Sequence, residues 1–234
     1  MVNILLTGAS RGIGAAAHSA LVAAGHHVIG QSTAGNDGFI AADFALPRAA
    51  DALWESALAA AGGRIDVLVN NAGVFEAVDI DDSADDFAAT WARSHAINLQ
   101  SAADLCRHAV RHFRGFGGGR IINVASRAGH RGDSPQHWHY AAAKGGMIAM
   151  TKSIARGYAR DNILAFAVAP GFTMTGMAEE YLSSRGGDKL LADIPLGRVA
   201  GPNEVAETIR WLATEAPPSL TGATLDINGA SYVR

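Results

Sequence analysis

Tyr140 and Lys144 are the residues whose types and spacing most directly suggest chemistry. They lie four positions apart in a segment with helical periodicity, residues 139–160, so their side chains share one helix face. An ammonium group near a phenol favours the phenolate and lowers the phenol pKa from about 10. Because a general acid or base works best with its pKa near the working pH, this pair is suited to proton transfer. Taken alone, the same spacing also occurs on ordinary helix faces with a partly buried ring.

A second candidate site is the stretch TGASRGIG, from Thr7 to Gly14. It follows an apolar run and opens a helical pattern, which is the setting of a phosphate-binding loop. Gly8, Gly12 and Gly14 allow a sharp turn and a close approach, and the helix behind them offers free N–H groups. The spacing departs from the strict G-x-G-x-x-G pattern, so a purely structural strand-to-helix turn is the alternative.

These residues must be positioned by an alternating series of short apolar runs and longer helical segments. Strands are expected at residues 2–6, 27–29, 65–69, 120–124, 163–168 and 224–227, and helices at 12–24, 47–61, 96–113, 139–160 and 202–213. Most of the runs are continuously apolar, as in strands that helices cover on both faces. The pattern predicts one α/β domain over residues 1–234, a Rossmann-type doubly wound parallel sheet with helices on both faces.

Composition narrows the classes of function. The chain has 234 residues, 49% of them hydrophobic, which is enough for a sizeable core, and a net charge of −3 gives no reason to expect nucleic-acid binding. No stretch approaches the ~18 apolar residues of a membrane helix. The single cysteine, Cys106, lies in an apolar-periodic segment and is expected to be buried and unreactive. We therefore expect a cytoplasmic protein that binds neither nucleic acid nor membranes.

Further motifs occur in a fixed order along the chain. NNAG follows the strand at 65–69, and after it come Asn98 in a helix, Ser126 at the end of RIINVAS, Tyr140 and Lys144 in YAAAK, and APG shortly before Thr173. This ordered set resembles the short-chain dehydrogenase/reductase family, and the resemblance covers essentially the whole chain.

The resemblance implies hydride transfer between a nicotinamide cofactor and a carbonyl or secondary alcohol, with Asn98, Ser126, Tyr140 and Lys144 as the catalytic set. Tyr140 would donate or remove the proton of the substrate oxygen, and Ser126 would hydrogen-bond the same oxygen. Lys144 would also hold the nicotinamide ribose, and Asn98 a water in a proton relay. The implied cofactor-binding residues line the phosphate loop, the adenosine side and the nicotinamide side: Gly8, Ser10, Arg11, Gly12, Ile13, Gly14, Ser32, Thr33, Asp43, Asn71, Ala72, Gly73, Tyr140, Lys144, Pro170, Gly171 and Thr173.

The end of the second strand bears on the choice between NADP(H) and NAD(H). NAD-dependent family members carry an acidic residue there for the ribose hydroxyls, whereas this chain has Ser32. Without a carboxylate, nothing repels a 2′-phosphate, and Arg11, Ser32 and Thr33 could bind it. We expect NADP(H). NAD(H) stays the alternative, because the motif with Arg11 also occurs in NAD-dependent relatives and Thr33 stands where a second basic residue often helps.

The chain between Thr33 and Asp43 is short. The stretch AGNDGFIAA has no room for both a helix and a strand, so we expect the helix that relatives have here to be lost or reduced to a turn. The adenine end, where Asp43 is expected, would then be more open. A trimmed surface without functional meaning is the alternative.

The substrate side is expected in the loop RAGHRGDSPQHWH, between Ser126 and Tyr140, and in a flap at about residues 172–201. The loop is one residue longer than is common in the family. We expect five of its residues to line the substrate pocket, with the Trp as an apolar wall: His130, Arg131, His137, Trp138 and His139. Their spacing is not that of a compact ligand set, so no metal site is expected. The flap residues Met174, Met177, Tyr181 and Leu182 suit an apolar or mixed substrate, or else a helix packed on the core.

The stretches PLGRVAGPNEVAETIRWLAT and LTGATLDINGA are similar to the carboxy-terminal third of 3-oxoacyl-(acyl-carrier-protein) reductases. Relatives acting on sugars, steroids and small alcohols share that similarity. Carrier-protein docking uses basic residues near two helix ends, and here only Arg156 and Arg160 lie near such an end, so the substrate stays open. The small residues 141–143, 145 and 146 let a helix approach closely, and the resemblance implies a homotetramer, or else a dimer. A nucleotide-binding regulator without catalytic activity is the rival from another class.

Overall fold

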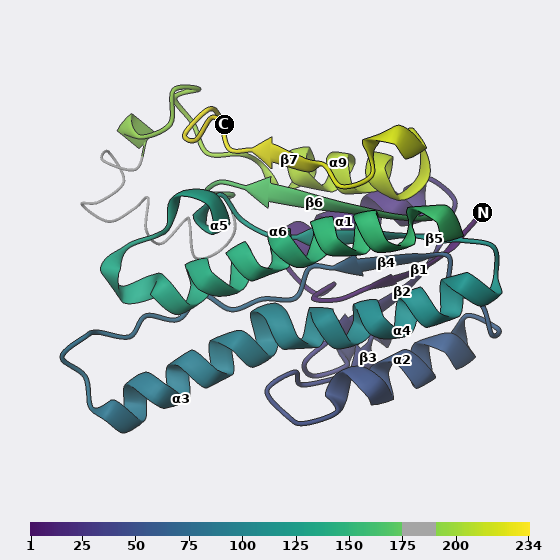
Figure 1. Cartoon of the computed structure of the whole chain (residues 1–234), viewed down its shortest axis with the longest axis horizontal. Coiled ribbons are helices and arrows are strands. Elements are labelled where there is room, and N and C mark those ends of the chain that lie inside the picture. Colours follow the sequence, from purple (N-terminus) through teal and green to yellow (C-terminus); the bar gives the residue numbers. More distant parts are fainter. Residues whose placement is uncertain (175–190) are drawn as a thin grey trace.

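The computed structural model, which describes residues 1–174 and 191–234, is built around a parallel β-sheet (Figure 1). The strands of these residues are β1 (Asn3–Leu6), β2 (His27–Ser32), β3 (Ile40–Ala41), β4 (Val67–Asn70), β5 (Gly119–Val124), β6 (Ile163–Pro170) and β7 (Thr224–Ile227). They pair in the order β3-β2-β1-β4-β5-β6-β7, and every pair is parallel. The order reverses direction between β1 and β4, which confirms the predicted Rossmann-type, doubly wound topology.

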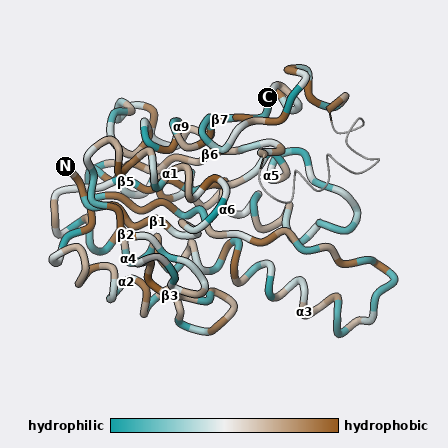
Figure 2. The backbone as a smooth tube through the Cα atoms, turned by 180° about the vertical axis from the view of Figure 1, so that it is seen from behind, coloured by the Kyte–Doolittle hydropathy of each residue, from teal (hydrophilic) through white to brown (hydrophobic). Residues whose placement is uncertain are grey.

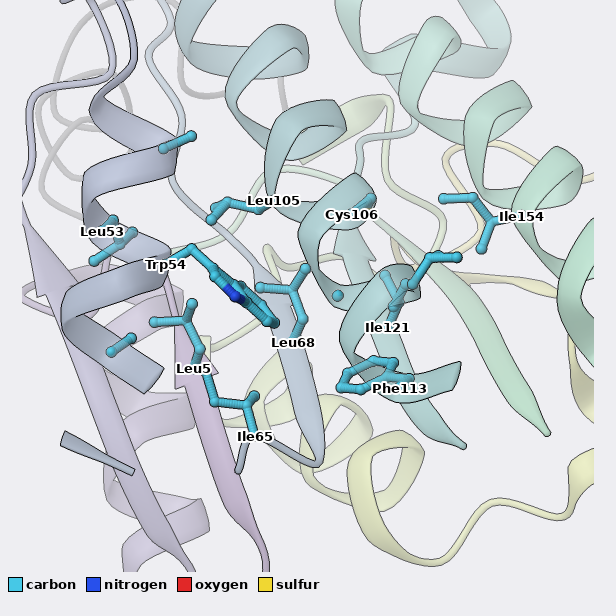
Figure 3. Close-up of a cluster of buried hydrophobic side chains, with 14 of the residues drawn as sticks. Leu5, Leu53, Trp54, Ile65, Leu68, Leu105, Cys106, Phe113, Ile121 and Ile154 are labelled. Atoms are coloured by element: carbon cyan, nitrogen blue, oxygen red, sulfur yellow. The ribbon is translucent and has the colours of Figure 1, made fainter. Parts of the chain in front are cut away.

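Helices cover both faces of the sheet, and the central strands contribute side chains to a core on each side. One face carries α2 (Ala49–Ala60), α4 (Ser101–Gly115) and α6 (Trp138–Tyr158), and the other carries α1 (Gly12–Ala23) and α9 (Pro202–Thr214). Leu5 points into the first core with Trp54 and Leu105 (Figure 3). Its neighbours Ile4 and Leu6 point into the second core. Because successive side chains alternate between two buried faces, the central strands are largely apolar, as the brown tube of β1 shows (Figure 2).

The helix predicted at 96–113 is part of a much longer rod. α3 (Ala84–His95) leads through a π-helical turn, Ala96–Gln100, directly into α4 (Figure 1). Ser83 caps α3 by accepting a hydrogen bond from the Asp86 N–H at 3.1 Å. The length of α3 was missed, because this exposed helix buries a single residue, Ser94, and carries little apolar signal.

The short segment after β2 takes the compressed form that its length predicts. A 3₁₀ turn, Asn36–Gly38, and the two-residue strand β3 replace a full helix and strand. Gly35 precedes the turn with φ +72°, a left-handed conformation that favours glycine. The remaining short elements are α5 (Ala128–Arg131) and 3₁₀ turns at Pro135–His137, Ala159–Asp161 and Pro218–Leu220.

The small residues of α6 have partners within the chain. A Cβ at Gly145 would lie 3.2 Å from the Gly129 oxygen of α5, and one at Gly146 would lie 3.0 Å from the Leu99 side chain. The close approach that these glycines permit is therefore used by the chain itself, and a subunit contact on this helix stays a prediction. No helix in the described part of the chain is long and apolar enough to cross a membrane.

Candidate active site

The candidate residues meet at the carboxyl edge of the sheet, because parallel strands all end on the same side. Thr7 follows β1, Asn71 follows β4, Ser126 lies just beyond β5, and Gly171 follows β6. This is the edge at which open α/β sheets bind their ligands.

The loop after β1 has the shape of a phosphate cradle. Gly8 and Gly12 adopt φ values of +64° and +55°. A Cβ on Gly14 would lie 1.9 Å from the Gly8 oxygen, so only glycine fits there. Arg11 occupies the N-cap of α1 without a side-chain cap, which leaves first-turn N–H groups for an anion. The donor set and the space therefore fit a dinucleotide pyrophosphate, with Ser10 exposed and Ile13 half-buried beside it.

The loop after β4 is fastened to this cradle. Asn71 Nδ2 donates to the oxygens of Thr7 (3.0 Å) and Gly8 (3.1 Å). The Thr7 hydroxyl in turn accepts from the N–H groups of Asn71 (2.9 Å) and Ala72 (3.0 Å). The predicted adenosine-side residues thus form one hydrogen-bonded unit with the phosphate loop.

The end of β2 holds a residue that sequence reasoning missed, Gln31. Its Oε1 accepts from Gly8 N–H at 2.8 Å and its Nε2 donates to the Ala42 oxygen at 2.7 Å, so a buried neutral amide ties the phosphate loop to β3. Ser32 is also buried, and its hydroxyl accepts from Gly35 N–H at 3.0 Å, whereas Thr33 is exposed. A polar residue interrupting an otherwise apolar strand end was the signal that could have singled out Gln31.

Asp43 lies beyond β3 and is half-buried. Its Oδ1 accepts a hydrogen bond from the Ala45 N–H at 2.9 Å, so the carboxylate stabilises its own turn. Contact of Asp43 with adenine stays a prediction.

Tyr140, Ser126 and Lys144 come together behind this edge. Tyr140 is half-buried and its hydroxyl hydrogen-bonds Ser126, and Ser126 Oγ accepts from the Ala128 N–H at 3.1 Å. Lys144 Nζ donates to the Val124 oxygen at 2.8 Å and lies 5.8 Å from the centre of the Tyr140 ring. Both side chains come from α6, four residues apart, as the sequence predicted.

The expected direction of the Tyr140 pKa is wrong for this structure. Burial raises the pKa of Tyr140 to about 12, and the hydrogen bond with Ser126 only partly offsets the rise. Burial also lowers the pKa of Lys144 to about 8. Desolvation of a charged group therefore outweighs the attraction between ammonium and phenolate, which was the effect that the sequence argument relied on.

Asn98 lies in the π-helical turn and holds the loop after β4. Its Oδ1 accepts from Val74 N–H, and its Nδ2 donates to the Val74 oxygen and to Ser94 Oγ, each at 3.0 Å. A Cβ on Gly73 would lie 2.8 Å from Asn98 Oδ1 and 3.6 Å from Lys144 Nζ, so Gly73 lies between the two. Both amide hydrogens of Asn98 already donate to acceptors within the chain. The water that was predicted for the proton relay would therefore be bound by oxygen atoms of this turn. Such π-helical turns are frequent at functional sites.

On the predicted nicotinamide side, Pro170, Gly171 and Thr173 form a tightly packed turn at the end of β6. Gly171 needs to be glycine, because a Cβ would lie 2.9 Å from that of Asn228. Thr173 is buried, its hydroxyl donates to the Gly171 oxygen at 3.3 Å, and it pairs with Ala200 in a parallel bridge. Met174 is partly exposed, while Met177, Tyr181 and Leu182 of the predicted flap lie outside the described residues.

The loop expected to form the substrate wall contributes one ring beside Tyr140. His137 stacks on Phe75 with 3.8 Å between ring centres, and Phe75 meets Tyr140 edge to face at 4.9 Å. His139 is buried and donates to the Glu76 oxygen at 2.9 Å, so it supports the loop rather than a pocket.

The other three residues of that loop contact other elements. Trp138 is 45% exposed and touches Phe87, so its role as a pocket wall stays a prediction. His130 stacks on Tyr232, and Arg131 pairs with Asp193. Among the described residues, no three His, Cys, Asp or Glu side chains gather closely enough to hold a metal ion.

A Rossmann-type sheet with a glycine cradle and a tyrosine–lysine pair at one edge is an arrangement that nucleotide-dependent oxidoreductases use. A family model described as enoyl-(acyl carrier protein) reductase matches residues 8–230. A 3-oxoacyl-(acyl-carrier-protein) reductase of Salmonella typhimurium is 36% identical, covering 98% of this chain and 96% of the relative. One from Synechocystis is 37% identical over 96% and 94%, and an acetoacetyl-CoA reductase of Acinetobacter is 34% identical over 98% and 97%. The chain belongs to the short-chain dehydrogenase/reductase family, as predicted, and is an oxidoreductase acting on C=O or CH–OH groups.

Proposed function

We propose that this protein reduces a carbonyl group to a secondary alcohol with NADPH, with Tyr140 as the proton donor. The observation that carries the proposal is the Tyr140 hydroxyl, hydrogen-bonded to Ser126 and backed by Lys144 beside the glycine cradle. The bound nicotinamide would supply the hydride.

The protonation state of Tyr140 favours the reductive direction. With a pKa of about 12 the phenol keeps its proton at neutral pH, so it can donate that proton to a substrate oxygen as negative charge develops there. Ser126 can donate a second hydrogen bond to the same oxygen. The Lys144 ammonium, held on the Val124 oxygen, would stabilise the phenolate left behind. Asn98 would hold the loop after β4, along which a proton would be returned to Tyr140.

Replacing Tyr140 by Phe tests this assignment. We expect Tyr140→Phe to lower kcat by at least about 100-fold, the lower end of what a general acid contributes. NADPH affinity should stay within threefold of wild type in a fluorescence titration, since the ring is retained. Unchanged turnover would contradict the role of Tyr140 as proton donor. Loss of NADPH binding would mean that the substitution disturbs the fold.

The preference for NADP(H) over NAD(H) is part of the proposal. The end of β2 presents the neutral residues Gln31 and Ser32, both buried and engaged within the chain. Arg11 and Thr33 are exposed beside the cradle and are the residues left to bind a 2′-phosphate. Since an arginine binds phosphate through paired, charge-assisted hydrogen bonds, Arg11 would contribute most of the selectivity.

Titration with both cofactors tests that preference. A charged hydrogen-bond partner is worth about 1.5–3 kcal/mol, so Arg11→Ala should weaken NADPH binding by roughly 10- to 150-fold. NADH binding should change less than threefold, and Thr33→Ala serves as the matched neighbour with a smaller effect. Equal affinity of the wild-type protein for NADH and NADPH would overturn the preference.

For the substrate we propose a class of compound, and for the assembly an oligomeric state. Because the relatives are 3-oxoacyl-(acyl-carrier-protein) and acetoacetyl-CoA reductases, small 3-oxo esters and thioesters are the first carbonyl compounds to assay, with aliphatic and aromatic ketones beside them. The stacked Phe75–His137 pair next to Tyr140 supports a substrate with an apolar portion. A homotetramer remains the expected assembly, with a dimer as the alternative, and sedimentation would separate the two.

A further inference from the structure

Arg127, the residue after Ser126, is a buried arginine that the proposed mechanism does not use. It is 8% exposed, and burying a guanidinium is costly unless charged and polar groups surround it. The side chain of Arg127 therefore occupies its position because specific partners hold it there.

Those partners come from segments far apart in the sequence. The Arg127 N–H donates to the Pro170 oxygen at 2.9 Å, which joins the end of β5 to the turn after β6. Its Nη1 lies 3.3 Å from Asp193 Oδ2, and its guanidinium carbon lies 5.1 Å from the centre of the Phe172 ring. One side chain thus connects the Ser126 turn with Phe172 and Asp193.

The other side of the Ser126 turn is fixed by backbone packing. A Cβ on Gly129 would lie 2.7 Å from the carbonyl carbon of Lys144, so α5 sits directly on the helix that carries Tyr140 and Lys144. The turn from Ser126 to Gly129 is therefore clamped between α6 and the segment after β6. On the second side the clamp consists of the Arg127 N–H bond to the Pro170 oxygen and of the contacts of the Arg127 side chain with Asp193 and Phe172.

We propose that Arg127 is a positioning residue, which fixes the distance between Ser126 and the turn at residues 170–173. This inference rests on the proposed function, because that turn is the expected nicotinamide side of the site. If the turn moves relative to Ser126 and Tyr140, the hydride donor and the proton donor no longer face the same carbonyl. Misplacements of about 1 Å can cost 100-fold in rate.

The chain offers a matched control in Arg131. It shares Asp193 Oδ2 with Arg127, at 3.0 Å, but its side chain is 38% exposed and its second partner is the Ser231 oxygen, at 3.1 Å. Arg131→Met therefore removes an equal charge and an ion pair with the same carboxylate while leaving the Phe172 contact intact. A general effect of charge or of the ion pair would appear in both variants.

The experiment compares Arg127→Met, Arg127→Lys, Asp193→Asn and Arg131→Met with the wild-type protein. Ethyl acetoacetate, a prochiral 3-oxo ester, is reduced with NADPH, and kcat, KM and the enantiomeric excess of the alcohol are measured. We expect Arg127→Met to lower kcat at least tenfold and to erode the enantiomeric excess, with the dissociation constant of NADPH changed less than threefold. Arg127→Lys should restore part of both, and Arg131→Met should match the wild-type protein.

A readout without turnover accompanies the kinetics, namely the emission of NADPH bound at saturation, which reports the surroundings of the nicotinamide. It should change in Arg127→Met and stay unchanged in Arg131→Met. A wild-type protein that binds NADPH but reduces no carbonyl would contradict the proposed function, and the emission comparison would still decide the role of Arg127.

Equal effects in the two Met variants, or wild-type emission, kcat and enantiomeric excess in Arg127→Met, would overturn the inference. Should Arg127→Met fail to fold, Arg127→Lys and Asp193→Asn decide in its place. Wild-type values in both of these would overturn the inference equally.

Discussion

Lys144 is the residue at which stability and function oppose each other most clearly. It is 3% exposed, and none of the described acidic residues forms an ion pair with it. Its pKa falls from 10.5 to about 8, which corresponds to roughly 3 kcal/mol of unfavourable free energy for the charged form in the fold. The hydrogen bond from Lys144 Nζ to the Val124 oxygen offsets about 1 kcal/mol of this unfavourable free energy. Under the proposed function, a buried cation with so little compensation is retained because it would stabilise the phenolate of Tyr140.

Replacing Lys144 by Met should therefore affect stability and turnover in different directions. Lys144→Met keeps the length of the side chain and removes the charge, so we expect an equal or higher free energy of unfolding at pH 7. Turnover should fall by at least about 100-fold, because the phenolate of Tyr140 loses its cation. Denaturant unfolding and steady-state kinetics on the same preparations measure both.

The pH dependence of this comparison has a definite sign. Between pH 8 and 10.5 the unfolded chain still holds the Lys144 proton that the folded chain has released, so wild-type stability rises with pH relative to Lys144→Met. Above pH 10 the raised pKa of Tyr140 acts in the opposite direction in both proteins, so pH 7 and 9.5 are the points to compare. A wild-type protein more stable than the variant at pH 7, or a stability difference that does not shift in favour of the wild-type protein between pH 7 and 9.5, would contradict the argument.

At the scale of elements, the sequence predicted the features that follow from hydrophobic periodicity and from the residues at the ends of strands. Continuous apolar runs located every described strand except β3, and residues directly after them, such as Asn71 and Ser126, fell at one edge because parallel strands end together. The loss of a helix between β2 and β3 followed from length alone. Spacing on one helix placed Tyr140 and Lys144 on a shared face.

Features that depend on contacts between distant elements could not be predicted in this way. The π-helical turn around Asn98 arises where one continuous rod must both pack on the sheet and hold Val74, and no local pattern marks it. Gln31 and Arg127 look like ordinary polar residues until the phosphate loop and Asp193 are brought to them by the fold. The pKa of Tyr140 also depends on desolvation, which spacing along a helix does not report.

At the scale of the whole molecule, Cys106 reports on the integrity of the fold. It is the only cysteine of the chain and is 2% exposed, in the core cluster that joins the sheet with α2, α4 and α6 (Figure 3). Asn70 Nδ2 donates to its sulfur at 3.3 Å and to Asn123 Oδ1 at 2.8 Å, so the thiol lies under the strand ends that carry Asn71 and Ser126. Burial raises the pKa of Cys106 to about 12, so its reactive thiolate is scarce in the folded protein.

A thiol reagent should therefore label Cys106 only when the molecule opens globally, and NADPH should slow that labelling. A ligand that binds only the folded state at 100 times its dissociation constant stabilises it by about 2.7 kcal/mol, which lowers the open fraction about 100-fold. We expect the labelling rate, measured at neutral pH with excess reagent, to fall by about that factor with NADPH and by less at the same concentration of NADH. Cys106→Ala is the blank. Rapid labelling of the folded protein, or a labelling rate that NADPH does not change, would contradict this prediction. It would show that α4 opens locally and that the core around Cys106 does not unfold together with the predicted cofactor-binding edge of the sheet.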